Sequence, residues 1–404
     1  MRADIHLYAS TDMPDAGADG PSPQDRRYSN ADVVRAYRKV EAWAKHADAL
    51  GYDTLWLTEH HFQYEGYEVV PNQVAMGLHL AGMTERLRFG QAFNVVPTWH
   101  PLRLAEDFAM ADVLTGGRMV FGVGRGTVPR ESIPLGSTVA SGDNQMSKDA
   151  DAHNREAFEE AMEIIQRAWT QERFSFHGKH YDLPPAGIPD RGRDVEELTL
   201  VPRPGRHVEI FQPVGSPRTT SYVAQQGFQG VFALASPERM KRTWDLFAEE
   251  AAKVGRVLEP GEGRAMQLMF HVGRTTEHAM ERGRPGHDEY VKFLSPYGRF
   301  GLYGEGLPFD YAPTLEETRA SRAMAFGSVD DVVDVLGEFM ETLDLRHALL
   351  FPELPGLTQD EVAEQMDLMA REVLPRLGVT LPGAAAADAT PVEAATPAEA
   401  AALR

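Results

Sequence analysis

Two adjacent histidines and a carboxylate, Glu59-His60-His61, follow the apolar run Thr54 to Thr58. An imidazole can exchange a proton near neutral pH, so at least one of these histidines could act as a general acid or base or polarise a substrate. A metal site needs three or more converging ligands, whereas neighbouring strand residues point to opposite faces, which argues against metal binding. The alternative is a structural, hydrogen-bonded pair. Glu59 is expected to be a buried partner that orients a neighbour.

Two glycine-containing segments could hold a phosphate. In Gly124-Arg125-Gly126 the small neighbours would let a ligand approach, and a guanidinium can bind a phosphate through two parallel hydrogen bonds. In Gly215-Ser216-Pro217 a hydroxyl and free backbone N–H groups stand at the predicted start of a helix, where anions bind readily. Alternatively, Arg125 could form a surface salt bridge and Ser216 could merely cap the helix. The segment around Arg125 is not a dinucleotide fingerprint, because Thr127 stands at the third glycine position of G-x-G-x-x-G.

Asn94 is a polar residue within the apolar run Leu87 to Val95. Burying an amide is costly without hydrogen-bond partners, so this position favours either a ligand contact or an internal hydrogen bond. Trp99 and His100 follow in a turn before a helix. They could line a pocket or cap that helix.

Eight short apolar runs would position these side chains. Most are continuously apolar rather than alternating, as in a parallel sheet that helices cover on both faces. The runs are Ile5 to Ala9, Thr54 to Thr58, Leu87 to Val95, Met119 to Val123, Val208 to Val214, Gly230 to Leu234, Met266 to Val272 and His347 to Phe351. Amphipathic segments such as Ala31 to Leu50 separate them. Eight strand–helix units favour a closed (β/α)₈ TIM barrel, whose functional residues lie at the C-terminal ends of the strands.

Three long segments interrupt this alternation, and loops of such length are usually lids or binding loops. They are Arg125 to Ala152, Phe174 to Arg206, with a hairpin predicted over Phe174 to Tyr181, and Ser295 to Met324. The predicted fold is therefore an α/β barrel with insertions after strands 4 and 5 and in the seventh unit. We expect one barrel domain over residues 1–378 and an Ala/Pro-rich tail over 379–404 that is disordered or loosely helical.

Composition excludes several classes of protein. The 404 residues carry 40 Lys and Arg against 60 Asp and Glu, a formal charge of -20, which opposes binding to nucleic acid or to an anionic membrane. There is no cysteine, so thiolate metal sites, iron–sulfur clusters and cysteine nucleophiles are excluded. The first residues lack the apolar stretch of a secretory signal, and no apolar run is long enough to cross a membrane. A cytoplasmic enzyme or binding protein is the expectation.

Three segments resemble the bacterial luciferase-like flavin monooxygenases and occur in the order typical of that family. They are Leu50-Gly-Tyr-Asp-Thr-Leu-Trp-Leu-Thr-Glu-His-His-Phe62, Arg88-Phe-Gly-Gln-Ala-Phe-Asn-Val-Val-Pro-Thr-Trp-His-Pro-Leu-Arg-Leu-Ala-Glu-Asp107 and Asp112-Val-Leu-Thr-Gly-Gly-Arg-Met-Val-Phe-Gly-Val-Gly-Arg-Gly126. Weaker similarity follows at 215–227 and 326–331, so the resemblance covers about residues 1 to 377. It implies a TIM barrel, in agreement with the count of apolar runs.

The resemblance also implies roles for particular residues. His60 corresponds to the catalytic histidine, and Arg125 to the arginine that binds the FMN phosphate. Ser216 and Thr219 correspond to hydroxyl ligands of that phosphate. Ala92-Phe93 corresponds to a cis peptide bond that supports the isoalloxazine ring. Gly215 and Asn94 are further expected cofactor contacts, and the expected substrate pocket includes Tyr8, His61, Trp99 and Phe232. No metal is expected.

The implied reaction uses reduced FMN, made by a separate flavin reductase, and O2. A C4a-peroxyflavin would oxygenate a small, largely apolar organic substrate, with His60 assisting proton transfer. The resemblance implies a homodimer, and the helices Ala75 to Met83 and Ala105 to Leu114 could supply its interface. Two other functions stay open: a deazaflavin-dependent dehydrogenase on the same barrel, and a non-catalytic flavin-binding subunit.

Overall fold

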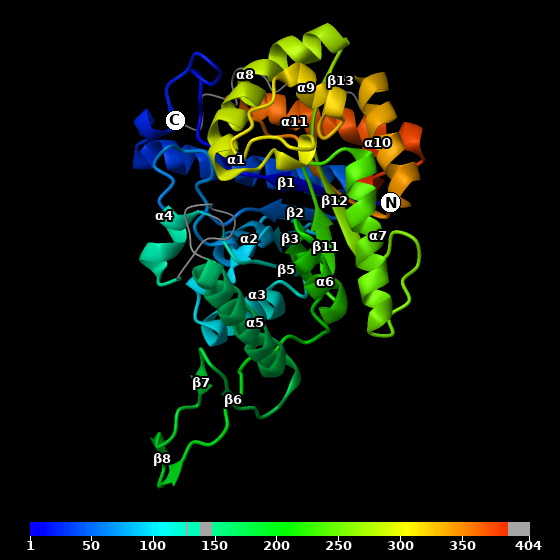
Figure 1. Ribbon diagram of the computed structural model, residues 1–404. Helices are drawn as coiled ribbons and strands as arrows, with labels where there is room; N and C mark the ends of the chain where they lie inside the picture. Colours follow the sequence, from blue (N-terminus) through cyan, green and yellow to red (C-terminus); the bar gives the residue numbers. More distant parts are fainter. Residues whose placement is uncertain (127, 138–147, 387–404) are drawn as a thin grey trace.

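The computed structural model describes residues 1–126, 128–137 and 148–386, and its centre is a closed barrel of eight parallel strands (Figure 1). Each strand pairs with the next, β5 with β10 and β14 with β1, which closes the barrel. The strands are β1 (Arg2–Leu7), β2 (Thr54–Leu57), β3 (Arg88–Gln91), β5 (Met119–Gly124), β10 (Ile210–Pro213), β11 (Gln229–Phe232), β12 (Arg264–Gly273) and β14 (His347–Phe351). The TIM-barrel prediction is confirmed, and each predicted run overlaps one barrel strand.

Helices surround the barrel and connect successive strands (Figure 1). The main ones are α1 (Asn30–Leu50), α2 (Gln73–Ala81), α3 (Pro101–Leu114), α5 (Lys148–Thr170), α6 (Pro217–Gln226), α7 (Pro237–Lys253), α8 (Thr276–Leu294), α10 (Val329–Leu343) and α11 (Gln359–Leu368). Local signals set their ends. In α1 the Ser29 hydroxyl accepts from the backbone of Asp32, whose carboxylate bonds back to Ser29, and Gly51 ends the helix at φ 87°. Within the described residues, no helix is long and apolar enough to cross a membrane.

Large side chains fill the barrel interior below the C-terminal ends of the strands. Trp56 and Phe211 meet edge to face, with ring centroids 5.0 Å apart, inside a buried cluster that includes Val231. Gly90 faces the Trp56 ring so closely that an added Cβ would lie 2.4 Å from it. The interior is therefore a packed core, and the C-terminal ends of the strands remain as the place for a site.

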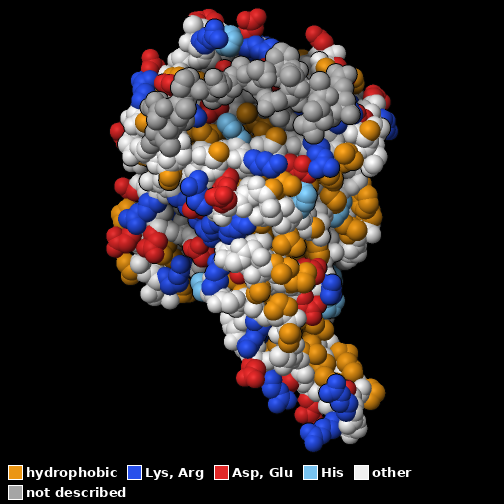
Figure 2. All heavy atoms as spheres, turned by 180° about the vertical axis from the view of Figure 1, so that it is seen from behind, with side chains coloured by type: hydrophobic (Ala, Val, Ile, Leu, Met, Phe, Trp, Pro, Cys, Tyr) orange, Lys and Arg blue, Asp and Glu red, His pale blue; other side chains and the backbone are white. Residues whose placement is uncertain are grey.

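The segment between α5 and β10 forms an arm that projects from the barrel (Figures 1 and 2). It holds two short hairpins, β6 (Phe176–His177) with β7 (Asp182–Leu183) and β8 (Pro189–Asp190) with β9 (Arg193–Asp194). The predicted first hairpin is present. The prediction of an insertion after strand 5 was wrong, because α6 begins four residues after β10 ends and the arm precedes β10.

The other long segments lie at the C-terminal ends of the strands. The connection after β5 contains the short helix α4 (Pro129–Ser132), and its residues 127 and 138–147 lie outside the described residues. After α8, the seventh unit continues through two 3-10 turns and α9 (Leu315–Ser321) to β13 (Ala325–Ser328), which pairs with the end of β12. Of the predicted tail, Pro382–Ala386 form α12, where Gly383 lies close to the end of α1, and 387–404 lie outside the described residues.

Candidate active site

His60 lies just beyond the end of β2 and is held between two buried carboxylates. Its Nδ1 is 3.1 Å from Glu131 Oε2, and its Nε2 is 3.0 Å from Glu68 Oε2. Glu68 comes from the connection between β2 and α2, and Glu131 from α4. The Gln63 amide also donates to Glu131, at 2.6 Å. Residues of two segments, the β2–α2 connection and α4, thus hold the imidazole in place.

These carboxylates decide the charge of His60. Burial by itself would lower the pKa of His60, but the charges and hydrogen bonds of Glu68 and Glu131 raise that pKa well above its ordinary value. Burial conversely raises the pKa of Glu131, and the His60 charge outweighs this effect, so the pKa of Glu131 is lowered. The ring is therefore an imidazolium with an N–H on each nitrogen, which can donate a proton and stabilise negative charge.

Glu59 orients its neighbours, as the sequence predicted. It is buried, and its Oε1 is 3.1 Å from His61 Nε2 and 3.0 Å from Trp99 Nε1. His61 therefore turns toward the connection between β3 and α3, away from the Glu68–Glu131 pair around His60. In the described residues no group of His, Asp and Glu is arranged to hold a metal ion.

The peptide bond between Ala92 and Phe93 is cis, as the resemblance implied. It is followed by β4 (Asn94–Val95), which pairs with the end of β5. The Asn94 Nδ2 donates to the carbonyl of Gly122 at 2.9 Å, while its buried Oδ1 has no protein partner in the described part of the chain. A Cβ on Gly122 would lie 1.8 Å from the Gln91 carbonyl, so only glycine allows this approach.

Arg125 and Ser216 follow neighbouring strands, since β5 and β10 pair through Gly122 and Phe211. Arg125 Nη1 forms an ion pair with Asp151 of α5, at 2.9 Å. The Ser216 hydroxyl accepts from the backbone N–H of Thr219 at 3.2 Å and lies 3.0 Å from its hydroxyl. Ser216 therefore caps α6, whose exposed start follows the strand next to the one that leads to Arg125.

This set of residues fits FMN. A phosphate monoester needs a cation and backbone or hydroxyl donors, which Arg125 and the start of α6 can supply. A flavin ring carries an N–H donor, and the buried Asn94 Oδ1 is an acceptor that no other described residue satisfies. Gly215 is exposed, and an added Cβ there would meet no atom within 4 Å, so ligand atoms can approach its backbone.

Two of the predicted pocket residues, Tyr8 and Phe232, lie in different surroundings. Tyr8 follows β1, and its hydroxyl lies 3.1 Å from that of Tyr290 in α8, near the site. Phe232 was predicted wrongly, because its ring packs on Trp244 of α7, with centroids 4.9 Å apart. Its neighbour Val231 belongs to the interior cluster instead. Because successive strand residues alternate in direction, Phe232 faces the helices.

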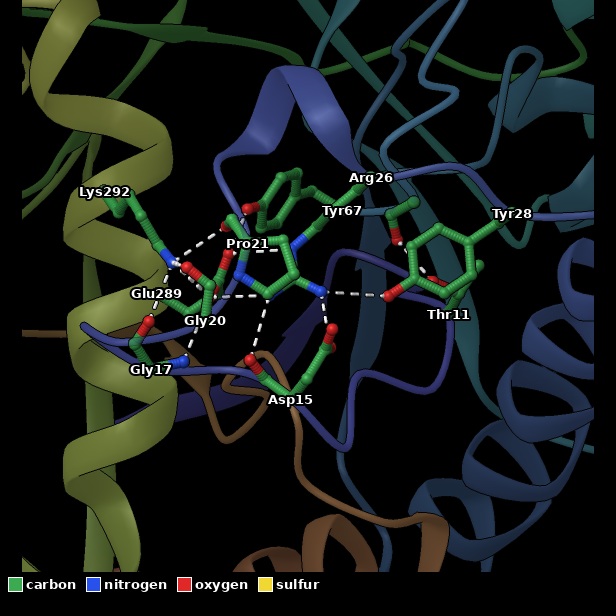
Figure 3. Close-up of polar contacts among 11 residues, drawn as sticks. Thr11, Asp15, Gly17, Gly20, Pro21, Arg26, Tyr28, Tyr67, Glu289 and Lys292 are labelled. Carbon is green, nitrogen blue, oxygen red and sulfur yellow. Dashed lines mark hydrogen bonds and ion pairs between the residues drawn. The ribbon is translucent and has the colours of Figure 1, made fainter.

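Sequence reasoning missed the ion-pair network that connects the loops above the site to α8 (Figure 3). The fully buried Glu289 accepts from Arg26 Nη2 at 2.9 Å and from the backbone N–H of Gly17 at 3.0 Å, and Tyr67 donates to it as well. Lys292, one turn further along α8, donates to the Gly17 carbonyl at 2.7 Å. The loops after β1 and β2 are thereby bound to one helix.

Comparison with known proteins places the chain among flavoenzyme relatives. Residues 13–371 match the sequence model of a family described as luciferase-like monooxygenase. The chain is 23% identical over 364 residues to 3,6-diketocamphane 1,6-monooxygenase of Pseudomonas putida, covering 85% of this chain and 94% of that protein. It is 26% identical over 355 residues to 4-hydroxyprotoasukamycin monooxygenase of Streptomyces nodosus subsp. asukaensis, with 85% and 87% covered.

A solved structure shows the same fold. The oxygenating constituent of 3,6-diketocamphane monooxygenase from Pseudomonas putida, determined in complex with FMN, superposes with a TM-score of 0.71 at 19% identity. The match covers 95% of this chain and 99% of that one.

Proposed function

Because this chain belongs to the luciferase-like monooxygenase family and is an enzyme of that class, we propose that it uses reduced FMN and O2 to oxygenate a small, largely apolar organic substrate. A separate flavin reductase supplies the reduced FMN. One arrangement carries this proposal. The imidazolium of His60 lies at the same end of the barrel as Arg125 and Ser216, which follow two neighbouring strands.

Each part of the site then has a task. Arg125, Ser216 and Thr219 hold the cofactor phosphate, while Ala92-Phe93 and Asn94 contact the ring. Bound reduced FMN supplies the electrons that activate O2. His60 donates a proton from Nδ1 or Nε2 and stabilises negative charge that develops near it. The loops that Glu289 binds together limit the access of water to this charge.

The test is anaerobic and aerobic turnover by the purified chain. Reduced FMN is offered with ¹⁸O2 and a panel of cyclic ketones, alkanals and alkanes, and product mass is measured. We expect FMN binding and one labelled oxygen in the product of at least one panel member, and loss of that product in His60→Ala with FMN binding kept. Reduction of a deazaflavin by substrate without O2 would instead establish a dehydrogenase. FMN binding without any oxygenated product would indicate a non-catalytic flavin-binding subunit.

We also propose that the chain forms a homodimer through α2 and α3. The outer face of α3 exposes three large apolar side chains, Met110, Val113 and Leu114, the last two with exposed fractions of 52% and 65%. An apolar face of this kind on an otherwise acidic protein favours association with a second copy.

A further inference from the structure

His6 has no role in the site described so far, although it is almost adjacent to it. It lies on β1 and shares the inward face of that strand with Asp4, which bonds to Trp56 Nε1 at 2.7 Å inside the barrel. Its ring stacks on Phe351, with centroids 4.8 Å apart, and meets Tyr8 edge to face at 5.7 Å. His6 therefore faces the interior, nearer to the C-terminal ends of the strands than Asp4.

The His6 ring is buried, and no hydrogen bond joins it to any residue that the structure describes. Its exposed fraction is 3%, and in the described part of the chain neither Nδ1 nor Nε2 has a protein partner. His287, which is also buried, bonds to Thr318 at 2.8 Å, whereas the buried Nδ1 of His271 likewise lacks a protein partner among the described residues. A buried polar ring without partners is costly, and such groups in binding sites are commonly satisfied by a ligand.

His6 stays neutral while His60 is charged. Burial, and then the nearby positive charge of His60, lower the pKa of His6 to about 3. A neutral imidazole offers one N–H donor and one nitrogen acceptor. It can therefore bond to an uncharged oxygen, either by donating to a carbonyl or by accepting from a hydroxyl.

The position of β1 points to the substrate rather than to the cofactor phosphate. Around the barrel, β1 is four strands from β10 in either direction, opposite the strand that Ser216 follows. It adjoins β2, which leads to His60, and the Thr58 hydroxyl beyond β2 is also buried without a protein partner among the described residues. Thr58 and Tyr8 directly follow Leu57 and Leu7, which are paired in the register of the two strands.

We propose that His6 hydrogen-bonds an oxygen of the organic substrate, which is therefore an apolar molecule that carries a carbonyl or hydroxyl group. This inference rests on the proposed monooxygenase function. Aromatic rings around His6 receive the apolar body: Tyr8 stacks on Tyr290, and Tyr290 contacts Phe300 of the seventh-unit insertion. His6 then places the substrate oxygen beside the proton donor His60.

The experiment measures binding to the full chain loaded with oxidised FMN. Cyclic ketones of six to twelve carbons are titrated by calorimetry, each against its parent hydrocarbon, with the wild type, His6→Phe and His6→Gln. In the wild type we expect at least one ketone to bind about 10-fold or more tightly than its hydrocarbon. His6→Phe abolishes that preference, and His6→Gln, whose amide keeps a donor and an acceptor, retains part of it. FMN affinity is the same in all three proteins.

Each other result overturns the inference. Equal binding of ketone and hydrocarbon by the wild type, or a preference that survives in His6→Phe, removes His6 from substrate recognition while leaving FMN-dependent turnover intact. A loss of FMN affinity in His6→Phe makes His6 a cofactor ligand. If His6 were needed only for folding, the His6→Phe protein would have a lower melting temperature than the wild type. Because the His6 ring makes no hydrogen bond with the described residues, we expect the melting temperature of His6→Phe to be unchanged or raised. Failure of the wild type to bind FMN refutes the proposed function itself.

Discussion

At the scale of single residues, the chemistry of this protein depends on opposite charge states of two neighbouring histidines. His60 is charged because Glu68 and Glu131 contact both of its nitrogens. His6 is neutral because it is buried beside that charge. Pairs of titratable groups whose surroundings separate their pKa values divide the roles of donor and acceptor between them.

Glu131→Gln should move the alkaline limb of the activity profile to lower pH. The raised pKa of His60 means that the ring keeps its proton from acid pH to well above pH 6.5 and loses it only as pH rises through that raised pKa. Removing one of the two negative charges lowers that pKa, so kcat declines at lower pH than in the wild type. The measurement is kcat against pH with FMN saturating.

Glu65→Gln is the matched control, because Glu65 is also a buried carboxylate of the same region but pairs with Arg130 rather than with His60. Its profile should coincide with that of the wild type. An alkaline limb that stays in place in Glu131→Gln would show that His60 does not titrate in the rate-limiting step.

Arg125→Gln should weaken FMN binding by about 10- to 100-fold, since a hydrogen bond to a charged group contributes about 1.5–3 kcal/mol.

Asp151→Asn should instead strengthen FMN binding, because the Asp151 carboxylate lies 2.9 Å from Arg125 and competes with a phosphate for it. Fluorescence quenching of FMN gives both dissociation constants. Arg155→Gln, which removes another cationic partner of Asp151, is the control in the same measurement of FMN dissociation constants. A dissociation constant unchanged in Arg125→Gln would place the phosphate elsewhere.

Much of this site could be predicted from local sequence. Glu59-His60-His61 and Arg125 stand directly after apolar strands, so their place at the barrel mouth follows from the strand order. Glu68 and Glu131 could not be found, because each lies in a connection whose course depends on tertiary packing. His6 carried a signal that was not used: Asp4, His6 and Tyr8 alternate along a buried strand. The prediction for Phe232 was wrong because a continuously apolar run does not reveal which face of the strand each residue occupies.

At the scale of elements, α8 is the support for the loops above the site. Glu289 accepts hydrogen bonds from Arg26 and Gly17 of the β1–α1 connection and from Tyr67 of the β2–α2 connection (Figure 3). The Tyr67 ring also stacks on Phe293 of α8, with centroids 4.1 Å apart. The sequence predicted α8 but not this role. Besides Lys292 on the same helix, the Glu289 carboxylate is paired with three residues more than 200 positions away, and no local sequence pattern reveals those contacts.

Glu289→Gln should lower the free energy of unfolding by about 3 kcal/mol or more, because it removes the buried counter-charge of Arg26 and leaves only the half-exposed Asp15 to pair with it. Chemical denaturation measures the change. Arg284→Gln on the same helix is the control, since its pair with Glu316 is exposed and should contribute at most about 1 kcal/mol. Equal losses in the two variants would refute a bracing role for Glu289.

At the scale of the whole molecule, net charge and exposed apolar side chains have opposite effects on the association of two copies of the chain. The formal charge of -20 keeps copies of the chain apart, whereas the outer face of α3 favours their association. The arm ends close to α3, because Arg206 donates to the buried Asp112 of that helix at 2.7 Å. Figure 2 shows apolar side chains distributed over the projecting arm.

Leu114→Asp should convert the proposed dimer into a monomer, because a carboxylate replaces the most exposed large apolar side chain of α3 in the proposed interface. Analytical ultracentrifugation should show twice the chain mass for the wild type and a single mass for the variant. Val257→Asp, at a valine with an exposed fraction of 91% outside α2 and α3, should leave the dimer intact. Salt screens the repulsion between two acidic copies, so the dimer should dissociate more readily at about 0.01 M ionic strength than at about 0.15 M. A monomeric wild type, or a Leu114→Asp protein that remains dimeric at both ionic strengths, would contradict the interface on α3.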